Sequence, residues 1–248
     1  MPSPPARKAD RVAHDLLARI VEGELQVGAL LPKEAALAER YGVNRSVVRE
    51  AIKLLEVHRL VRPIRRRGTE VLDPLASLSP QVIRTMLRPR AGVVDRGILA
   101  DLLEVRAELD VQMTGLAAER RTDADLAIMD DCVERMRDAL AEPQRYRALM
   151  SELARAIARA TRNRILEMLV HFHDMVHADL EDIFSTVRPA SEPHLTGLSV
   201  LVELIRRQDV AQARALVAAF HDWATPRILA IAALSAGEPL ERVMEEAR

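Results

Sequence analysis

The sequence predicts a mainly α protein in which an N-terminal winged helix-turn-helix, three helices plus a small β-hairpin, precedes an all-helical antiparallel bundle. Three observations lead to this prediction. Residues 31–69 show a helix, a glycine turn, a capped basic helix and a basic hairpin, in that order. Beyond residue 80 the apolar spacing is helical, with no strand alternation after residue 72. The 248 residues include nine glycines, one tryptophan, two tyrosines and three phenylalanines, so the core should be aliphatic, as in helical bundles.

The domain boundaries follow from local composition. Residues 1–9 are expected to form a disordered leader, because they lack the apolar segment of a signal peptide. Residues 10–72 form the winged helix-turn-helix domain. Pro74 and two serines, followed directly by Pro80, mark residues 73–79 as a linker. Residues 80–248 then form the helical domain.

The helix-turn-helix itself has clear start and stop signals. A first helix is expected at residues 10–22, and a second begins after Pro32. Gly42 supplies the tight turn, and Asn44 is a good N-cap for the third helix. These signals place two short helices around one turn.

The third helix separates apolar and basic residues. Its apolar face holds Val48, Ala51, Ile52 and Leu55. Its basic stripe consists of Arg45, Arg49 and Lys53 and lies roughly 120° around the helix axis from the apolar face. Such a helix buries one side and offers cations to phosphates and guanine edges, as a major-groove reader requires.

Two short strands are expected at residues 60–61 and 71–72, joined by a basic wing tip at residues 65–69. A basic helix in an ordinary bundle would not explain the cap, turn and basic hairpin appearing together. The residues expected to contact DNA are Lys33, Arg40, Asn44, Arg45, Ser46, Arg49, Lys53, Arg65, Arg66, Arg67, Gly68 and Thr69.

The second domain is expected to contain helices at residues 80–88, 95–121, 123–140, 143–160, 163–185, 193–207 and 210–235. The breaks include Gly92, Thr122-Asp123, Pro143 and Asp209. Pro226 should kink or interrupt the last helix, because proline removes a helical hydrogen bond.

Composition and missing motifs argue against a disulfide-stabilised protein, a membrane-spanning protein and an enzyme. The net charge is −1, and the basic excess is confined to residues 40–67, which suits a DNA-binding domain joined to a neutral domain. The single Cys132 allows no disulfide framework and is consistent with the cytoplasm. No apolar run reaches the roughly 20 residues that span a bilayer. A Gly-rich phosphate loop, a cysteine nucleophile with a base and an acidic metal cluster are all missing, so an enzyme is not expected.

Residues 21–71 resemble the GntR family of bacterial transcription regulators. The residues carrying this resemblance are Gly28, Leu31-Pro32, Glu34, Leu37-Ala38, Gly42-Val43, Arg45, Val48-Arg49-Glu50-Ala51, Leu54-Leu55, Leu60-Val61 and Gly68-Thr69. The family usually has serine or alanine at the position of Lys33, and a DNA-contacting arginine at the position of Ala35. Ala35 removes that DNA contact, and Lys33 is the candidate to replace it. It usually has a second wing glycine at Arg66 and an aromatic at Glu70. These departures imply a wing that reads its site differently.

The C-terminal part resembles the FCD effector domain of the FadR subfamily. The carrying residues are Leu103, Arg106, Asp110, Ala117-Ala118-Glu119-Arg120, Ile157, Ala160-Thr161, Asn163, Ile205, Asp209 and Ala213. The resemblance implies an antiparallel bundle of six or seven helices around a ligand cavity. It also implies a homodimer whose partners are a palindromic double-stranded DNA operator and a small organic effector.

Most such domains bind a divalent metal through one aspartate and three histidines. Carried over by position from Asn163 and Asp209, these ligands fall at Met150, Ala154, Leu198 and Phe220. None of these side chains binds a hard or borderline cation. We therefore expect no metal and no cofactor.

The histidines leave three alternatives open. His173 and His177 share one helix face at i, i+4, beside apolar residues, and His194 and His221 could join them. His173 and His177 would form a different metal site with these two, make polar contacts to an organic effector, or simply pack.

The residues expected to bind the effector are Arg106, His173, His177, Phe184, Leu198, Phe220, His221 and Trp223. Arg106 occupies the position of a cavity-facing cation in the family, and a buried guanidinium needs an anionic partner. That partner would be an effector carboxylate or phosphate, or an internal aspartate such as Asp110 or Asp101. The apolar replacements at the metal positions favour an amphipathic organic anion, with a fatty acyl thioester ahead of a small hydroxy- or keto-acid.

The leading hypothesis is a ligand-responsive, homodimeric transcription regulator, with a repressor role expected. The alternatives are the same regulator responding to a small carboxylic acid through a histidine metal site, and an architectural DNA binder without an effector. The polar residues expected at the cavity disfavour the architectural binder. The sequence leaves open the identity of the effector, the operator sequence, the regulated genes and whether effector binding releases or promotes DNA binding.

Overall fold

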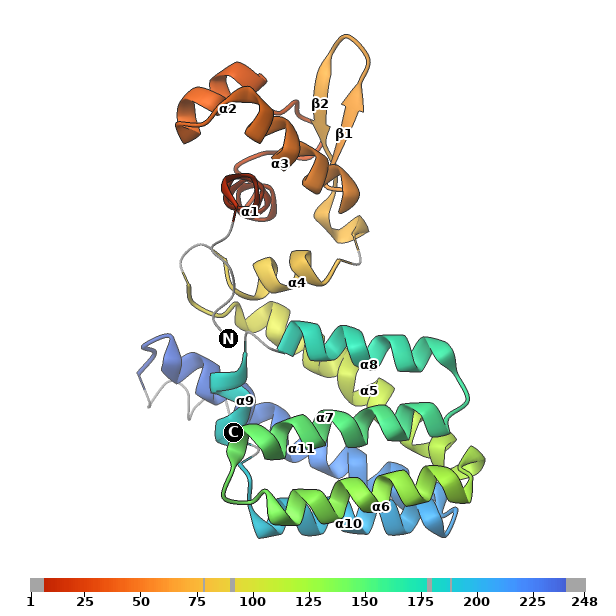
Figure 1. Cartoon of the computed structure of the whole chain (residues 1–248). Coiled ribbons are helices and arrows are strands. Elements are labelled where there is room, and N and C mark those ends of the chain that lie inside the picture. The colour runs from red at the N-terminus through yellow and green to blue at the C-terminus, as the bar shows by residue number, and fades with distance from the viewer. Residues whose placement is uncertain (1–6, 78, 90–91, 178–179, 188, 240–248) are drawn as a thin grey trace. The chain divides into compact units, whose positions relative to one another are not determined.

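A computed structural model describes residues 7–77, 79–89, 92–177, 180–187 and 189–239, with the backbone alone at residues 177, 181 and 182. The chain forms two compact units, Met1–Asp95 and Arg96–Arg248 (Figure 1). The predicted mainly α fold is confirmed, with a two-stranded hairpin in the first unit and helices alone among the described elements of the second.

The first unit contains the three predicted helices, α1 (Lys8–Val21), α2 (Glu34–Tyr41) and α3 (Arg45–Val57). α1 begins two residues earlier than predicted, because the Asp10 carboxylate accepts the Arg7 backbone N–H at 3.1 Å and caps the helix. Residues 1–6 of the expected leader lie outside the described part. The core of the unit is formed by α1, α2, α3 and the hairpin, with Leu16, Leu37 and Leu55 almost fully buried.

The turn between α2 and α3 has the predicted geometry. Gly42 has a φ of 61° and ends α2 in the left-handed region, where a side chain would be strained. The Asn44 side chain then accepts the Val47 backbone N–H at 3.0 Å and starts α3.

The hairpin consists of β1 (Val61–Ile64) and β2 (Gly68–Val71), paired antiparallel from Val61↔Val71 to Ile64↔Gly68. The strands are longer than predicted. Gly68 and Thr69 therefore belong to β2 rather than to the turn, which is left to residues 65–67.

The linker and the next helix differ from the prediction. The sequence predicts a second domain beginning at residue 80, but the compact units meet between Asp95 and Arg96. A short 3₁₀ helix, η1 (Pro74–Ala76), leads to α4 (Pro80–Leu87), which contacts α1. The physical reason is burial, because Val82 on α4 belongs to the apolar core of the first unit.

The described helices of the second unit are α5 (Arg96–Arg120), α6 (Asp123–Asp138), α7 (Pro143–Ala160), α8 (Arg164–His177), α9 (Glu181–Val187), α10 (Glu192–Arg206) and α11 (Val210–Ser235). α5 packs against α11 and α6 against α7 (Figure 1). Short connections between α6 and α7 and between α10 and α11 make these neighbours antiparallel. The predicted breaks at Thr122 and Asp209 are N-caps, because the two side chains accept backbone N–H groups at the starts of α6 and α11.

One helix prediction is wrong, and the interruption allowed for at Pro226 is absent. Residues 163–185 form two helices rather than one, because α8 packs on α7 whereas α9 packs on α11. Pro226 does not interrupt α11, which continues to Ser235. Buried Ala224 and Ile228 hold the helix on both sides of the proline, which compensates for the missing hydrogen bond. No described helix is long and apolar enough to cross a membrane.

Candidate functional site

The exposed face of α3 is the first candidate site. Val48, Ala51 and Leu55 are buried against the core of the first unit. Away from this buried side, α3 exposes four residues that the sequence predicts to contact DNA, namely Arg45, Ser46, Arg49 and Lys53. The helix therefore presents a continuous basic stripe to solvent, with the Asn44 cap at its start.

Arg49 has a partner that the sequence analysis missed. Its Nε donates to Glu34 Oε2 of α2 at 2.8 Å, and the two side chains are 66% and 37% exposed. Exposed pairs of this kind contribute about 0–1 kcal/mol, so a DNA phosphate or guanine can compete for the guanidinium. The carboxylate also removes part of the positive charge from the centre of the stripe.

The wing tip carries the predicted cations. Arg65, Arg66 and Arg67 are exposed, and the Arg67 backbone N–H closes the turn on the Ile64 carbonyl at 3.0 Å. Arg66 has a φ of 64°, a conformation that favours glycine, which explains why a glycine is usual at this position.

The other predicted DNA residues lie around these two elements. Lys33 is exposed at the N-cap of α2, and Arg40 is exposed in its last turn. Gly68 and Thr69 lie in β2, where the Thr69 carbonyl accepts the Leu31 N–H at 2.7 Å. Next to them Glu70, where an aromatic is usual, pairs with Arg62 of β1 at 2.7 Å.

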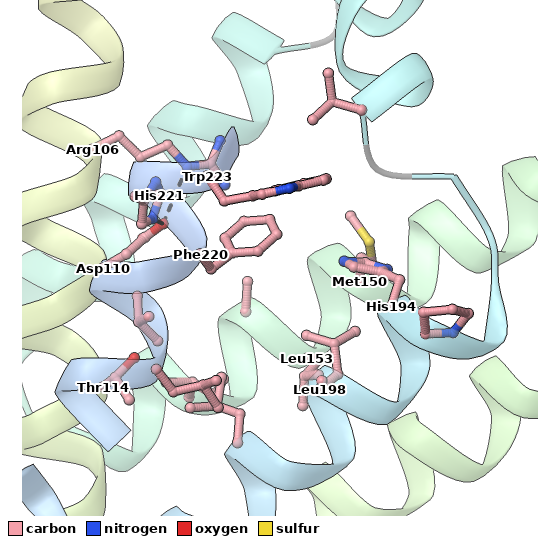
Figure 2. Close-up of a pocket in the computed structure, with 18 of the residues that line it drawn as sticks. Arg106, Asp110, Thr114, Met150, Leu153, His194, Leu198, Phe220, His221 and Trp223 are labelled. Carbon is pink, nitrogen blue, oxygen red and sulfur yellow. Dashed lines mark hydrogen bonds and ion pairs between the residues drawn. The ribbon is translucent and has the colours of Figure 1, made fainter. Parts of the chain in front are cut away.

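A cavity of about 600 Å³ in the second unit is the second candidate site (Figure 2). It is lined by residues of α5, α7, α9, α10 and α11, mostly apolar. Five of the predicted effector residues line it, namely Arg106, Leu198, Phe220, His221 and Trp223. The size falls within the range of small-molecule sites.

The four positions where the family would place metal ligands all line this cavity. They are Met150, Ala154, Leu198 and Phe220. Their side chains are three aliphatic or aromatic groups and one thioether, which do not fit a divalent cation held by carboxylate and imidazole. Among the described residues no group of three or more His, Cys, Asp or Glu side chains could hold a metal ion.

The polar wall of the cavity is an ion-pair network. Arg106 Nε donates to Asp110 Oδ2 at 3.2 Å, and His221 Nε2 lies 3.1 Å from the same oxygen. Burial alone raises the pKa of Asp110, but the Arg106 charge and the His221 hydrogen bond outweigh it and lower the pKa to about 2. Of the partners that the sequence left open for Arg106, the structure shows Asp110.

A second cavity of about 410 Å³ holds two further predicted residues, His173 and Phe184. It shares Arg106, Asp110 and Met150 with the first cavity, so the two adjoin. Burial, reinforced by the Arg106 charge, lowers the pKa of His173 to about 4, which keeps the imidazole neutral. The His177 side chain lies outside the described part.

His194 also lines the first cavity but was not assigned to effector binding from the sequence. Its Nδ1 lies 2.9 Å from the Tyr146 hydroxyl, which is buried. Burial raises the pKa of Tyr146 to about 12. No sequence spacing links these two residues, which are 48 positions apart.

The rim of the first cavity is marked by Trp223, which is 46% exposed. Its ring centroid lies 6.1 Å from that of Phe220, and Figure 2 shows the indole above the phenyl ring. Arg227 Cζ lies 4.6 Å from the Trp223 ring centroid, a cation–π contact. The sequence analysis missed Arg227, although the i, i+4 spacing from Trp223 was a usable signal.

Comparison with known proteins bears on both sites. Residues 8–71 match the family described as bacterial regulatory proteins, gntR family, and residues 101–222 match the FCD domain. The chain is 29% identical to an uncharacterized HTH-type transcriptional regulator of Mycobacterium tuberculosis, over 91% of this chain and 92% of that protein. It is 33% identical to the HTH-type transcriptional regulator LutR of Bacillus subtilis, over 61% of this chain and 67% of LutR.

A solved structure supports the fold. It is described as "Lar controls the expression of the Listeria monocytogenes agr system and mediates virulence", and it is 18% identical with a TM-score of 0.59. The alignment covers 91% of this chain and 98% of that one.

Proposed function

The chain belongs to the gntR family of bacterial regulatory proteins and is a DNA-binding transcription regulator with an FCD domain, and from this premise we propose that it acts as a ligand-responsive homodimer on a palindromic operator. Its relatives are transcription regulators rather than enzymes. We place its action in the cytoplasm, where bacterial DNA is found.

The single observation that carries the proposal is the two-sided α3. One side is buried in the core and the other exposes Arg45, Arg49 and Lys53. Laid in a major groove, this helix would bring Arg45 and Arg49 to base edges and leave Lys53 for a phosphate. The wing arginines would follow the backbone or enter the adjacent minor groove.

Homodimer formation is supported by an exposed apolar stripe on α8. Ile165, Met168 and Met175 share one side of this helix and are 61%, 65% and 50% exposed. Exposed apolar residues on one side of a helix favour a protein contact, because covering them removes apolar surface from water. A second copy related by a two-fold axis would cover it with the same residues, and the operator would then be palindromic.

The cavity supports an organic effector. Its apolar lining and the loss of the metal ligands favour an amphipathic organic anion, with a fatty acyl thioester ahead of a small carboxylic acid. Each buried methylene contributes roughly 0.8 kcal/mol, so affinity should rise with chain length until the cavity is full. A small acid would show no such dependence.

The test combines DNA binding and release. Purified protein is first challenged with its own upstream DNA and with a scrambled duplex in a mobility-shift assay. Acyl-CoAs from C8 to C18 are then titrated into the complex, beside short hydroxy- and keto-acids. A chain-length-dependent change in operator affinity supports the proposal. If operator affinity does not depend on acyl chain length and a short acid releases the DNA instead, the proposal of a lipid effector is wrong. If the protein binds the scrambled duplex as tightly as its upstream DNA, the proposal of a specific operator is wrong.

A further inference from the structure

We propose that the cavity takes up the uncharged, apolar part of its ligand, and that the ligand's anionic group stays at the rim beside Trp223 and Arg227. This inference rests on the proposed function, in which the same cavity binds the effector. It reverses the expectation that Arg106 inside the cavity meets the anionic head.

The interior has no spare positive charge for an anion. Arg106 is held by Asp110 at 3.2 Å, and the two side chains are 18% and 27% exposed. His221 holds the same carboxylate oxygen at 3.1 Å. An entering carboxylate that took Arg106 would leave the Asp110 charge without its guanidinium partner, and separating a partly buried pair is unfavourable because one charge loses its partner away from bulk water.

Apart from Thr114, Ser191 and His194, the rest of the lining away from the opening is apolar. The wall away from the ion pair is formed by Met113, Leu153, Ile157, Leu201, Leu216 and Val217. These side chains offer methyl and methylene contacts and no hydrogen-bond donors. An ionised group pushed against them would lose its hydration without compensation, whereas an alkyl chain would gain contact area.

The rim has the opposite character. The exposed residues that line the cavity are Thr186, Pro189, Pro193, Gly197 and Trp223, which places its opening between α9, the start of α10 and the middle of α11. Figure 2 shows the Trp223 indole projecting over the cavity from α11.

Arg227 supplies a cation at this opening. Its guanidinium lies over the indole at 4.6 Å, and its Nη1 donates to the Trp223 carbonyl at 2.7 Å. Among the described residues no carboxylate forms an ion pair with it. Arg227 is also exposed, so an anion there would keep part of its hydration.

The apolar interior and the cation at the rim together define the ligand class. It is a linear amphiphile with one apolar tail and one anionic end, whether a free carboxylate or the head of a larger conjugate. A second charge at the far end of the tail would have to enter the apolar interior. The cavity should therefore distinguish a monoanion from a dianion of the same length.

The experiment uses dodecanoate, dodecan-1-ol and dodecanedioate as probes, with the full-length protein. Binding is measured by calorimetry and by the fluorescence of Trp223, the one tryptophan in the chain. We expect dodecanoate to bind about tenfold more tightly than dodecanedioate, because the dianion buries a charge at the closed end. Dodecanedioate binding as tightly as dodecanoate would overturn the proposal, since it would require an anion site inside.

Variants of Arg227 test the rim cation. Arg227→Gln should remove the preference for dodecanoate over dodecan-1-ol, and Arg227→Lys, which keeps the charge, should retain it. An unchanged preference in Arg227→Gln would overturn the assignment, as would failure of all three probes to bind. Operator affinity is measured on the same preparations. Probes that bind as expected without changing operator affinity would leave this inference standing and contradict the effector role in the proposed function.

Discussion

Arg49 of α3 and Glu34 of α2 form an exposed ion pair, with Nε and Oε2 2.8 Å apart, in the middle of the basic stripe. The pair orients the guanidinium before DNA arrives and lowers the local positive charge. It is an electrostatic competitor for the phosphate or base that Arg49 would contact. An exposed carboxylate at this place lowers the affinity of Arg49 for any phosphate within reach, so a bidentate guanine contact gains relative to a single phosphate contact.

The first prediction concerns Arg49→Ala. Affinity for the specific operator should fall by on the order of 1–3 kcal/mol, because alanine cannot make a bidentate pair with guanine. Affinity for random DNA should change little. Fluorescence anisotropy with both duplexes measures this difference. Equal weakening on both would assign Arg49 to a phosphate, and unchanged affinity on both would contradict the docking of α3.

Glu34→Gln is the matched control for that experiment. It should strengthen binding to both duplexes, because it removes a competing negative charge. The free energy of unfolding should change by about 0–1 kcal/mol, as expected for an exposed pair. Weaker operator binding by this variant would show that Glu34 positions Arg49 rather than competing for it.

The second prediction concerns the wing. Replacing Arg65, Arg66 and Arg67 together by glutamine should flatten the slope of log K against log salt by roughly 0.9 for each phosphate that the wing no longer neutralises. Titrations between low and moderate salt measure the slope. Arg66→Gly separates the effect of charge from the effect of backbone strain. It removes one charge and also relieves the left-handed backbone at this residue, whose φ is 64°. A slope unchanged in the triple variant would mean that the wing stays off the DNA.

The local signals in the sequence were sufficient for the turn and cap of the helix-turn-helix in the first unit. Gly42 and Asn44 act on their own neighbours, so their roles could be predicted from residue type and position alone. The Arg49–Glu34 pair joins residues 15 positions apart on two helices, and only their packing brings the charges together. The same limit explains the break between α8 and α9, because each keeps a helical pattern while the packing partner changes from α7 to α11.

For the cavity, the sequence spacing offered several partners for Arg106 and did not decide between them. Arg106 and Asp110 stand at i, i+4, a spacing that allows a pair without requiring it. The second partner of Asp110, His221, lies 111 positions away in the sequence, and only the packing of α11 on α5 brings it to the pair. The charge state of the interior therefore could not be read from the sequence.

The third prediction is that purified protein carries no stoichiometric transition metal. The motivation is the apolar or thioether character of Met150, Ala154, Leu198 and Phe220, all of which line the cavity. Elemental analysis of protein prepared without chelators measures the content. One equivalent of zinc or nickel per chain that disappears in His173→Ala would contradict this prediction and revive the histidine site.

The fourth prediction concerns the α8 stripe. Met168→Glu should convert a dimer to monomers and weaken operator binding, because a charge would enter the apolar contact. Analytical ultracentrifugation measures the change in mass. Val200→Glu is the control, since Val200 is an exposed apolar residue on α10, at 45% exposure, outside the stripe. Dimers that survive Met168→Glu would place the interface elsewhere.

The fifth prediction is a pH dependence of stability. Burial, with the Arg106 charge adding to it, lowers the pKa of His173 to about 4 in the folded protein. The unfolded chain takes up the proton near the ordinary value of about 6.5, so it binds more protons than the folded chain between these two values. Stability should therefore decrease as pH falls from about 6.5 to about 4, by on the order of 1–3 kcal/mol.

Urea unfolding between pH 4 and pH 7, followed by Trp223 fluorescence, measures this decrease in the helical unit. Asp110, with its pKa near 2, adds its own decrease in stability at lower pH, because its folded pKa lies below that of the unfolded chain. His173→Gln should flatten the profile between pH 4 and pH 6.5. His171→Gln, at an exposed position of the same helix, should leave the profile as it is. Identical profiles for the wild type and His173→Gln would show that the imidazole does not remain neutral in the folded protein.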